Sequence, residues 1–114
     1  MKLHIVLVQY FLTALMVFIL PIYYAHSAED VITVEIFKFQ FTPQEITIKP
    51  GTTVRWINKE KRQYHSVWFE QLGEPEPDYF FPDEHYDRKF SNEGSFPYRC
   101  GPHPKMTGVV HVKK

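Results

Sequence analysis

The sequence has little cysteine and no excess of charge of either sign. Both features limit the classes of protein to which the chain can belong. Cys100 is the single cysteine among 114 residues, so no disulfide can form within one chain. Lysine and arginine together number 13, and so do aspartate and glutamate. A nucleic-acid-binding protein usually presents a basic face, so this balance argues against a nucleic-acid partner.

Helical periodicity is also missing. From Val31 onward no helical pattern runs longer than about two turns, and the sequence contains no internal repeat. Short alternating runs are instead separated by turn residues, about every 8 to 12 positions. We expect one β-strand in each of seven segments: 31–41, 44–49, 52–58, 64–70, 85–91, 95–100 and 107–114. An all-β chain of this kind predicts an antiparallel β-sandwich.

Two of these segments carry more detailed expectations. In 31–41, Ile32, Val34 and Ile36 alternate onto one face. In 52–58, Val54 and Trp56 should face one way and Arg55 the other. The pair Pro50-Gly51 before the second segment predicts a type II turn with a positive φ at the glycine.

The N-terminal residues differ in kind from the rest. An uncharged apolar run, "IVLVQYFLTALMVFIL", predicts a secretory signal peptide over residues 1–27. Cleavage after Ser27 would leave the small residues Ala25 and Ser27 at positions minus three and minus one. The alternative is an uncleaved membrane anchor, because residues 5–24 give about 20 mostly apolar positions. In both cases we expect the domain 29–114 to be exported, to the periplasm or elsewhere.

Export makes the lone cysteine informative. Cysteines in an oxidising compartment normally pair, so Cys100 is a dimer link, a buried apolar residue, a reactive thiol or a metal ligand. Its surroundings favour the last reading, because "YRCGPHPKMTG" places Cys100, His103 and Met106 at three-residue intervals. Once the leader is removed, Met106 is also the only methionine left. Three such donors in one loop can converge on one metal ion.

A fourth donor must come from elsewhere in the chain. His65, within "YHSVWF", is the best candidate, since a strand beside the last ones would bring it to the same end of the sandwich. His85 is its rival, but it borders an irregular acidic segment. His111 alternates with valines and should lie on a solvated face.

The donor set itself indicates the metal. Magnesium and calcium prefer oxygen ligands, and structural zinc sites rarely include methionine. Two histidines and a thiolate with a weak axial methionine are typical of blue-copper electron-transfer centres. The sequence therefore predicts one copper ion per chain, held by His65, Cys100, His103 and Met106.

Three stretches, "YRCGPHPKMTGVVHV", "PGTTVRWIN" and "YHSVWF", resemble the cupredoxins, and among them the amicyanin and plastocyanin types. The resemblance covers residues 31–114. It implies a Greek-key β-sandwich of about seven or eight strands with copper at one end. It also implies roles for the four donors: an upstream-strand ligand (His65), an equatorial thiolate (Cys100), a solvent-edge imidazole (His103) and a weak axial thioether (Met106).

The chain departs from this family at Ser66. Asparagine commonly follows the first ligand histidine there, and its side chain ties the two ligand segments together. Because serine is shorter, we expect this tie to be weakened. Pro102 has no N–H to donate to the thiolate, and we expect a lower reduction potential than a donor at that position would give.

The leading functional hypothesis is a monomeric one-electron carrier and not an enzyme, working between redox proteins such as a c-type cytochrome, a dehydrogenase or an oxidase. The alternative is copper binding for delivery or tolerance. Membrane contact is expected only if the N-terminal segment stays uncleaved. The acidic segment 71–84 is either a solvated loop anchored by aromatic residues or a docking patch for a basic redox partner.

Overall fold

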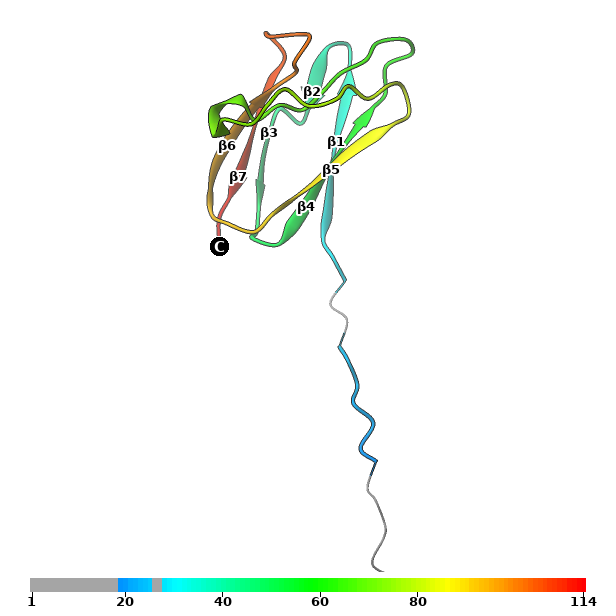
Figure 1. Cartoon of the computed structure of the whole chain (residues 1–114), viewed down its shortest axis with the longest axis vertical. Coiled ribbons are helices and arrows are strands. Elements are labelled where there is room, and N and C mark those ends of the chain that lie inside the picture. The colour runs from blue at the N-terminus through cyan, green and yellow to red at the C-terminus, as the bar shows by residue number, and fades with distance from the viewer. Residues whose placement is uncertain (1–18, 26–27) are drawn as a thin grey trace, which may run out of the picture.

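The computed structural model describes residues 19–25 and 28–114. Most of the predicted leader, 1–27, lies outside the described residues, so the signal peptide and its cleavage stay predictions. Residues 19–25 have no regular structure and extend away from the folded part of the chain (Figure 1). Within the described ranges, no helix is both long enough and apolar enough to cross a bilayer.

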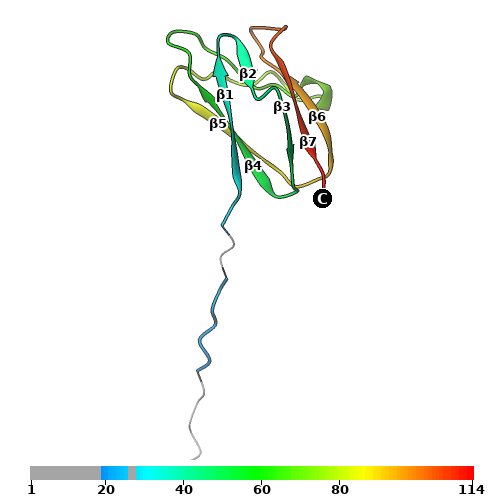
Figure 2. The ribbon, with the colours of Figure 1, turned by 180° about the vertical axis from the view of Figure 1, so that it is seen from behind.

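The described residues form seven strands and one short 3-10 helix, η1. The elements are β1 (Val31–Phe37), β2 (Gln40–Thr42), β3 (Glu45–Ile48), β4 (Thr52–Asn58), η1 (Glu70–Leu72), β5 (His85–Phe90), β6 (Gly94–Arg99) and β7 (Thr107–Val112). One sheet has the strand order β2-β1-β4-β5 and the other β3-β7-β6. The two sheets pack face to face (Figures 1 and 2), which confirms the predicted β-sandwich.

Not all neighbouring strands are antiparallel, however. The pairs β1/β4 and β3/β7 are parallel, while β1/β2, β4/β5 and β6/β7 are antiparallel. The chain leaves the first sheet after β2, passes through β3 in the second sheet, and returns as β4. This crossing places β4 beside β1 with both strands running in the same direction. The alternation of apolar and polar residues within a strand does not indicate the direction of its neighbour.

The single strand predicted over 31–41 is wrong, because a tight turn divides it into β1 and β2. Lys38 and Phe39 form the turn, with φ values of +50° and +57°. Two successive positive φ angles are typical of a type I′ hairpin, which usually contains asparagine or glycine. Neither residue gives that signal. The hairpin buries Phe41 and leaves Phe39 at the exposed tip.

The strand predicted over 64–70 is also wrong. That segment makes two isolated bridges, His65 with Phe80 and Trp68 with Arg99, and then enters η1. Its backbone therefore pairs first with the 71–84 region and then with the end of β6. The composition is typical of a strand, but the segment pairs with Phe80 at one residue and with Arg99 at another. It therefore does not form a continuous ladder with either neighbour.

The core lies between the two sheets. Val34, Ile36, Val54 and Trp56 are completely buried, and the ring of Trp56 lies 5.3 Å from that of Tyr98 in the opposite sheet. The predicted facing of 52–58 is thus confirmed. Ile32, at the beginning of β1, is 42% exposed and does not join the core. Gly51 has a φ of +92°, as expected for the predicted turn.

Candidate metal centre

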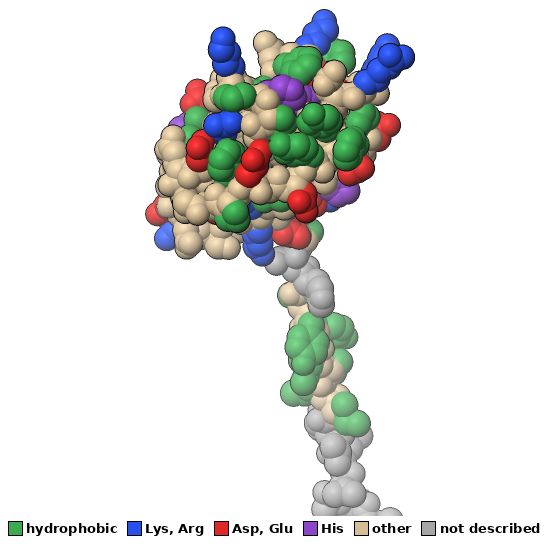
Figure 3. All heavy atoms as spheres, turned by 45° about the horizontal axis from the view of Figure 1, so that its top comes forward, with side chains coloured by type: hydrophobic (Ala, Val, Ile, Leu, Met, Phe, Trp, Pro, Cys, Tyr) green, Lys and Arg blue, Asp and Glu red, His purple; other side chains and the backbone are tan. Residues whose placement is uncertain are grey.

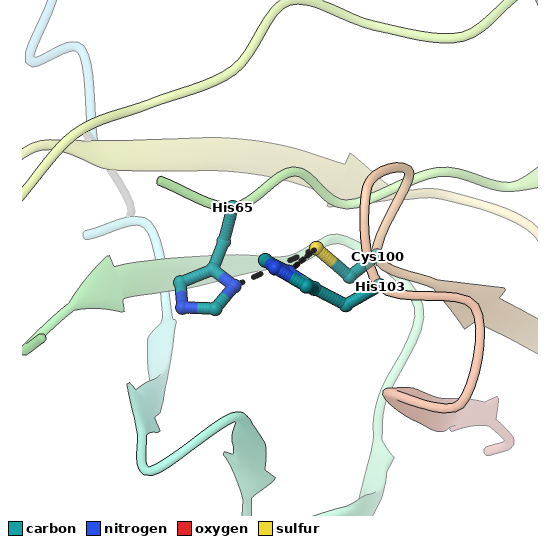
Figure 4. Close-up of side chains that lie close together, drawn as sticks. All are labelled: His65, Cys100 and His103. Carbon is teal, nitrogen blue, oxygen red and sulfur yellow. Dashed lines mark hydrogen bonds between the residues drawn. The ribbon is translucent and has the colours of Figure 1, made fainter. Parts of the chain in front are cut away.

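Three of the four predicted ligands meet at one end of the sandwich. The Sγ atom of Cys100 lies 3.6 Å from Nδ1 of His65 and 3.5 Å from Nδ1 of His103. Figure 4 shows both imidazole rings directed toward the sulfur, with His65 on one segment and Cys100 and His103 on another. Cys100 and His65 are completely buried, and His103 is partly buried. The separation of 35 residues between His65 and Cys100 is closed only by the fold.

The loop between β6 and β7 is closed by its own backbone. The amide of Cys100 donates to the carbonyl of Met106 at 2.9 Å, and the amide of Met106 donates to the carbonyl of His103 at 2.9 Å. Met106 is buried in the core cluster. These two bonds hold the backbones of Cys100, His103 and Met106 close together.

The backbone of His65 is fixed by hydrogen bonds, and a carboxylate lies beside its ring. Its N–H and C=O both pair with Phe80, at 3.2 and 2.9 Å. The Nε2 atom lies 3.5 Å from Oε1 of Glu60, a side chain that is 10% exposed. Burial, followed by the charge of His103, lowers the pKa of His65, while Glu60 acts in the opposite direction. A histidine kept neutral in this way offers a free lone pair to a metal.

Burial is also the main influence on the pKa of the Cys100 thiol. It raises the pKa of Cys100, while hydrogen bonds from the Ser66 and His103 backbone oppose the rise. The amide of Ser66 lies 3.4 Å from Sγ as a donor. The thiolate is the form that ligates metals, and a bound metal ion favours that form. One sulfur with two imidazole nitrogens is a donor set that suits copper.

The expected weakening at Ser66 is not found. Its Oγ accepts a hydrogen bond from the amide of Gly101 at 2.8 Å, so the serine does span the two ligand segments. The backbone of Gly101 lies close enough to Ser66 for the short serine side chain to accept this hydrogen bond. A Cβ added at Gly101 would lie 2.8 Å from the same Oγ and against the Glu76 carboxylate, so this close approach requires glycine.

Phe39 belongs to the site and was missed by the sequence analysis. Its ring meets that of His103 edge-on at 4.9 Å and that of His65 at 5.6 Å. Its backbone amide donates to Oε1 of Glu60 at 2.8 Å, the same oxygen that lies near His65. No ligand spacing signals such a contact, because it depends on the unpredicted turn between β1 and β2.

The surface above the site is largely apolar. A shallow hollow is lined by Phe39, Pro102, His103, Pro104, Lys105 and Met106. Figure 3 shows hydrophobic side chains gathered near a histidine on this end of the molecule, with lysine and arginine side chains projecting at its edge. His103 therefore sits where the buried centre comes nearest to solvent.

The remaining described histidines lie away from the cluster. His85 is about half exposed and lies 4.0 Å from Asp87. His111, on a partly exposed face as predicted, bonds with Ser95 and Glu45. Neither belongs to the group of donor atoms that can hold a metal ion.

The acidic segment is partly neutralised within the chain. Glu74 pairs with Arg88 at 2.6 Å, and the neighbouring Glu70 pairs with Arg99 at 3.3 Å. The hydroxyl of Tyr79 donates to Glu76 at 3.1 Å. Both earlier interpretations of this segment, a solvated loop or a docking patch, stay predictions.

Comparison with known proteins agrees with this geometry. The model of the copper-binding proteins of the plastocyanin/azurin family matches residues 28–113. The amicyanin of Paracoccus versutus is 36% identical over 97 residues, covering 82% of this chain and 73% of that protein. The plastocyanin of Scenedesmus fuscus is 34% identical over 85 residues, covering 64% and 86%. The crystal structure of the Paracoccus versutus amicyanin superposes with a TM-score of 0.66 at 33% identity, covering 76% of this chain and 85% of that one.

Proposed function

The chain belongs to the plastocyanin/azurin family of copper-binding proteins, and on that premise we propose that it carries single electrons between redox proteins. The family match also confirms the resemblance and the copper ion predicted from the loop. The observation that carries the proposal is the convergence of one buried thiol, one buried imidazole and one partly exposed imidazole in a single group. A bound copper would supply reversible exchange between Cu(I) and Cu(II).

We assign the metal to His65, Cys100 and His103, with Met106 as the weak fourth ligand that the family resemblance implies. The first two are held by bonds to Phe80 and Ser66, so they have little freedom to move. A shell that moves little between two oxidation states lowers the cost of passing an electron. With four ligands from the chain, no coordination position is left for a substrate, which favours a carrier over an enzyme.

His103 is the proposed point of electron entry and exit. It is the only partly exposed member of the three convergent residues, and it lies within the apolar hollow described above. A redox partner, such as a c-type cytochrome, a dehydrogenase or an oxidase, would cover this hollow and exclude water from the path. Charged residues at its edge would affect the encounter rate more than the affinity.

The cellular setting is part of the same proposal. We infer that residues 1–27 direct export and that the monomeric domain 29–114 works outside the cytoplasm. The intact mass of the protein recovered after export measures this directly. A mass that matches the chain from residue 28 onward supports cleavage after Ser27. A full-length, membrane-bound product supports the uncleaved anchor.

The visible spectrum of the exported, copper-loaded protein tests the electron-carrier proposal. Intense thiolate-to-Cu(II) absorption is expected, and Cys100→Ser should abolish it, while the matched surface variant His85→Ala should keep it. A colourless wild-type site that readily gives Cu(I) to chelators would contradict the proposal and favour copper delivery or tolerance.

A further inference from the structure

Arg99, the residue directly before Cys100, is tied to the first turn of the metal-binding loop. It is the last residue of β6, and its side chain is 25% exposed. Its Nε donates to the carbonyl of Cys100 at 3.2 Å, and one Nη donates to the carbonyl of Gly101 at 2.9 Å. The guanidinium thus binds two successive carbonyls of the loop, those of Cys100 and Gly101.

The same side chain is anchored to the segment that follows His65. Its other Nη lies 3.3 Å from Oε2 of Glu70, and its guanidinium lies 5.0 Å from the ring centre of Trp68. The backbones of Trp68 and Arg99 also exchange two hydrogen bonds, of 2.8 and 3.0 Å. Arg99 therefore contacts both segments that bring ligands to the centre.

We propose that Arg99 is a positioning residue, which fixes the Cys100 backbone relative to His65 by holding the loop carbonyls against the Trp68–Glu70 segment. This inference rests on the proposed copper site. Together with the bond between Ser66 and Gly101, it gives the loop a second tie to the same segment. The two ties act on opposite groups of the loop: Ser66 accepts from an amide, and Arg99 donates to carbonyls.

Only arginine suits this position. Its planar guanidinium offers five N–H donors in a fixed fork, so one side chain can serve two carbonyls and a carboxylate at once. Lysine would offer a point charge without that fork, and it would not stack on Trp68 in the same way. Groups that orient metal ligands commonly change metal affinity by about 10-fold to 100-fold when they are removed.

The test compares Arg99→Met with Arg88→Met in the full-length protein. Arg88 is a close control, because it also binds a carboxylate, that of Glu74 at 2.6 Å, and also lies over an aromatic ring, that of Phe69 at 4.5 Å. Its hydrogen bonds go to Glu74 and not to the metal-binding loop. Methionine keeps part of the aliphatic stem in both variants.

Three readouts are measured: amide hydrogen exchange of Cys100 and Gly101 in the metal-free protein, the Cu(II) electron paramagnetic resonance spectrum, and copper transfer to a Cu(I) chelator. Arg99→Met should speed exchange of these two amides about tenfold or more. It should also change the copper hyperfine splitting and weaken copper retention about 10-fold to 100-fold. Arg88→Met should leave all three as in the wild type.

Equal behaviour of the two variants in all three readouts would overturn the inference. Glu70→Gln separates the contributions, because it removes the ion pair while the carbonyl bonds stay, and it should behave nearly as the wild type. If Arg99→Met fails to fold, Arg99→Lys is compared with Arg88→Lys by the same criteria. A wild type without thiolate-to-copper absorption would refute the proposed function, while amide exchange in the metal-free protein would still decide the role of Arg99.

Discussion

Replacing Ser66 with alanine removes one atom that joins the two ligand segments. The Oγ of Ser66 accepts the amide of Gly101 at 2.8 Å, and Ser66 is completely buried. Without this oxygen the partly buried amide of Gly101 loses its hydrogen-bond partner. Leaving a buried donor unpaired costs about 1–3 kcal/mol. In a domain of this size each kcal/mol lowers the melting temperature by about 4–8 °C.

The assay is thermal and urea unfolding of the metal-free protein, so that copper affinity does not enter the result. Ser95→Ala is the control, because that hydroxyl is exposed and bonds only with His111 among the described side chains. The control should change stability by less than about 0.5 kcal/mol. A loss for Ser66→Ala no larger than the loss for the control would refute the claim that the serine bridges the segments.

Three further results are expected. Trp56→Ala should cost about 3–5 kcal/mol in urea unfolding, because the ring is completely buried between the sheets. The hydrogen bond from Arg88 lowers the pKa of Glu74. The stability that this pair contributes is therefore present above the ordinary carboxyl pKa of about 4.3 and is lost as the pH falls below it. In Arg88→Met, the unfolding midpoint should consequently fall less steeply with decreasing pH in this acidic range than in the wild type. Pro102→Ala should raise the reduction potential measured by voltammetry, since an added N–H can donate toward the Cys100 thiolate, and an unchanged or lower potential would count against this account.

The metal-binding loop was the most predictable part of the molecule because its donors are local. Cys100, His103 and Met106 lie within seven residues, so their spacing alone indicated a shared site. The core face of β4 was equally readable from alternation. His65 was harder, since it reaches Cys100 only through the fold. Its neighbouring apolar pattern favoured it over His85, and the structure places His65 beside Cys100 and leaves His85 about half exposed.

The sequence could not reveal features that depend on unusual backbone or on pairing between distant segments. The turn at Lys38 and Phe39 lacks the usual glycine or asparagine, so neither the hairpin nor the contact of Phe39 with the histidines was foreseen. The reach of Ser66 depends on how closely Gly101 approaches, a distance that side-chain length alone does not give. The same limit applied to Arg99, whose partners come from η1 and the loop itself.

The central claim is that one copper ion, held by His65, Cys100, His103 and Met106, exchanges single electrons without leaving the protein. Repeated voltammetry of the exported, copper-loaded protein tests it most directly, with metal content measured before and after the cycles. We predict one reversible one-electron wave, unchanged copper content, and loss of the wave in Cys100→Ser but not in His85→Ala. An irreversible wave with copper released on reduction would contradict the claim and identify the site as one for copper transfer.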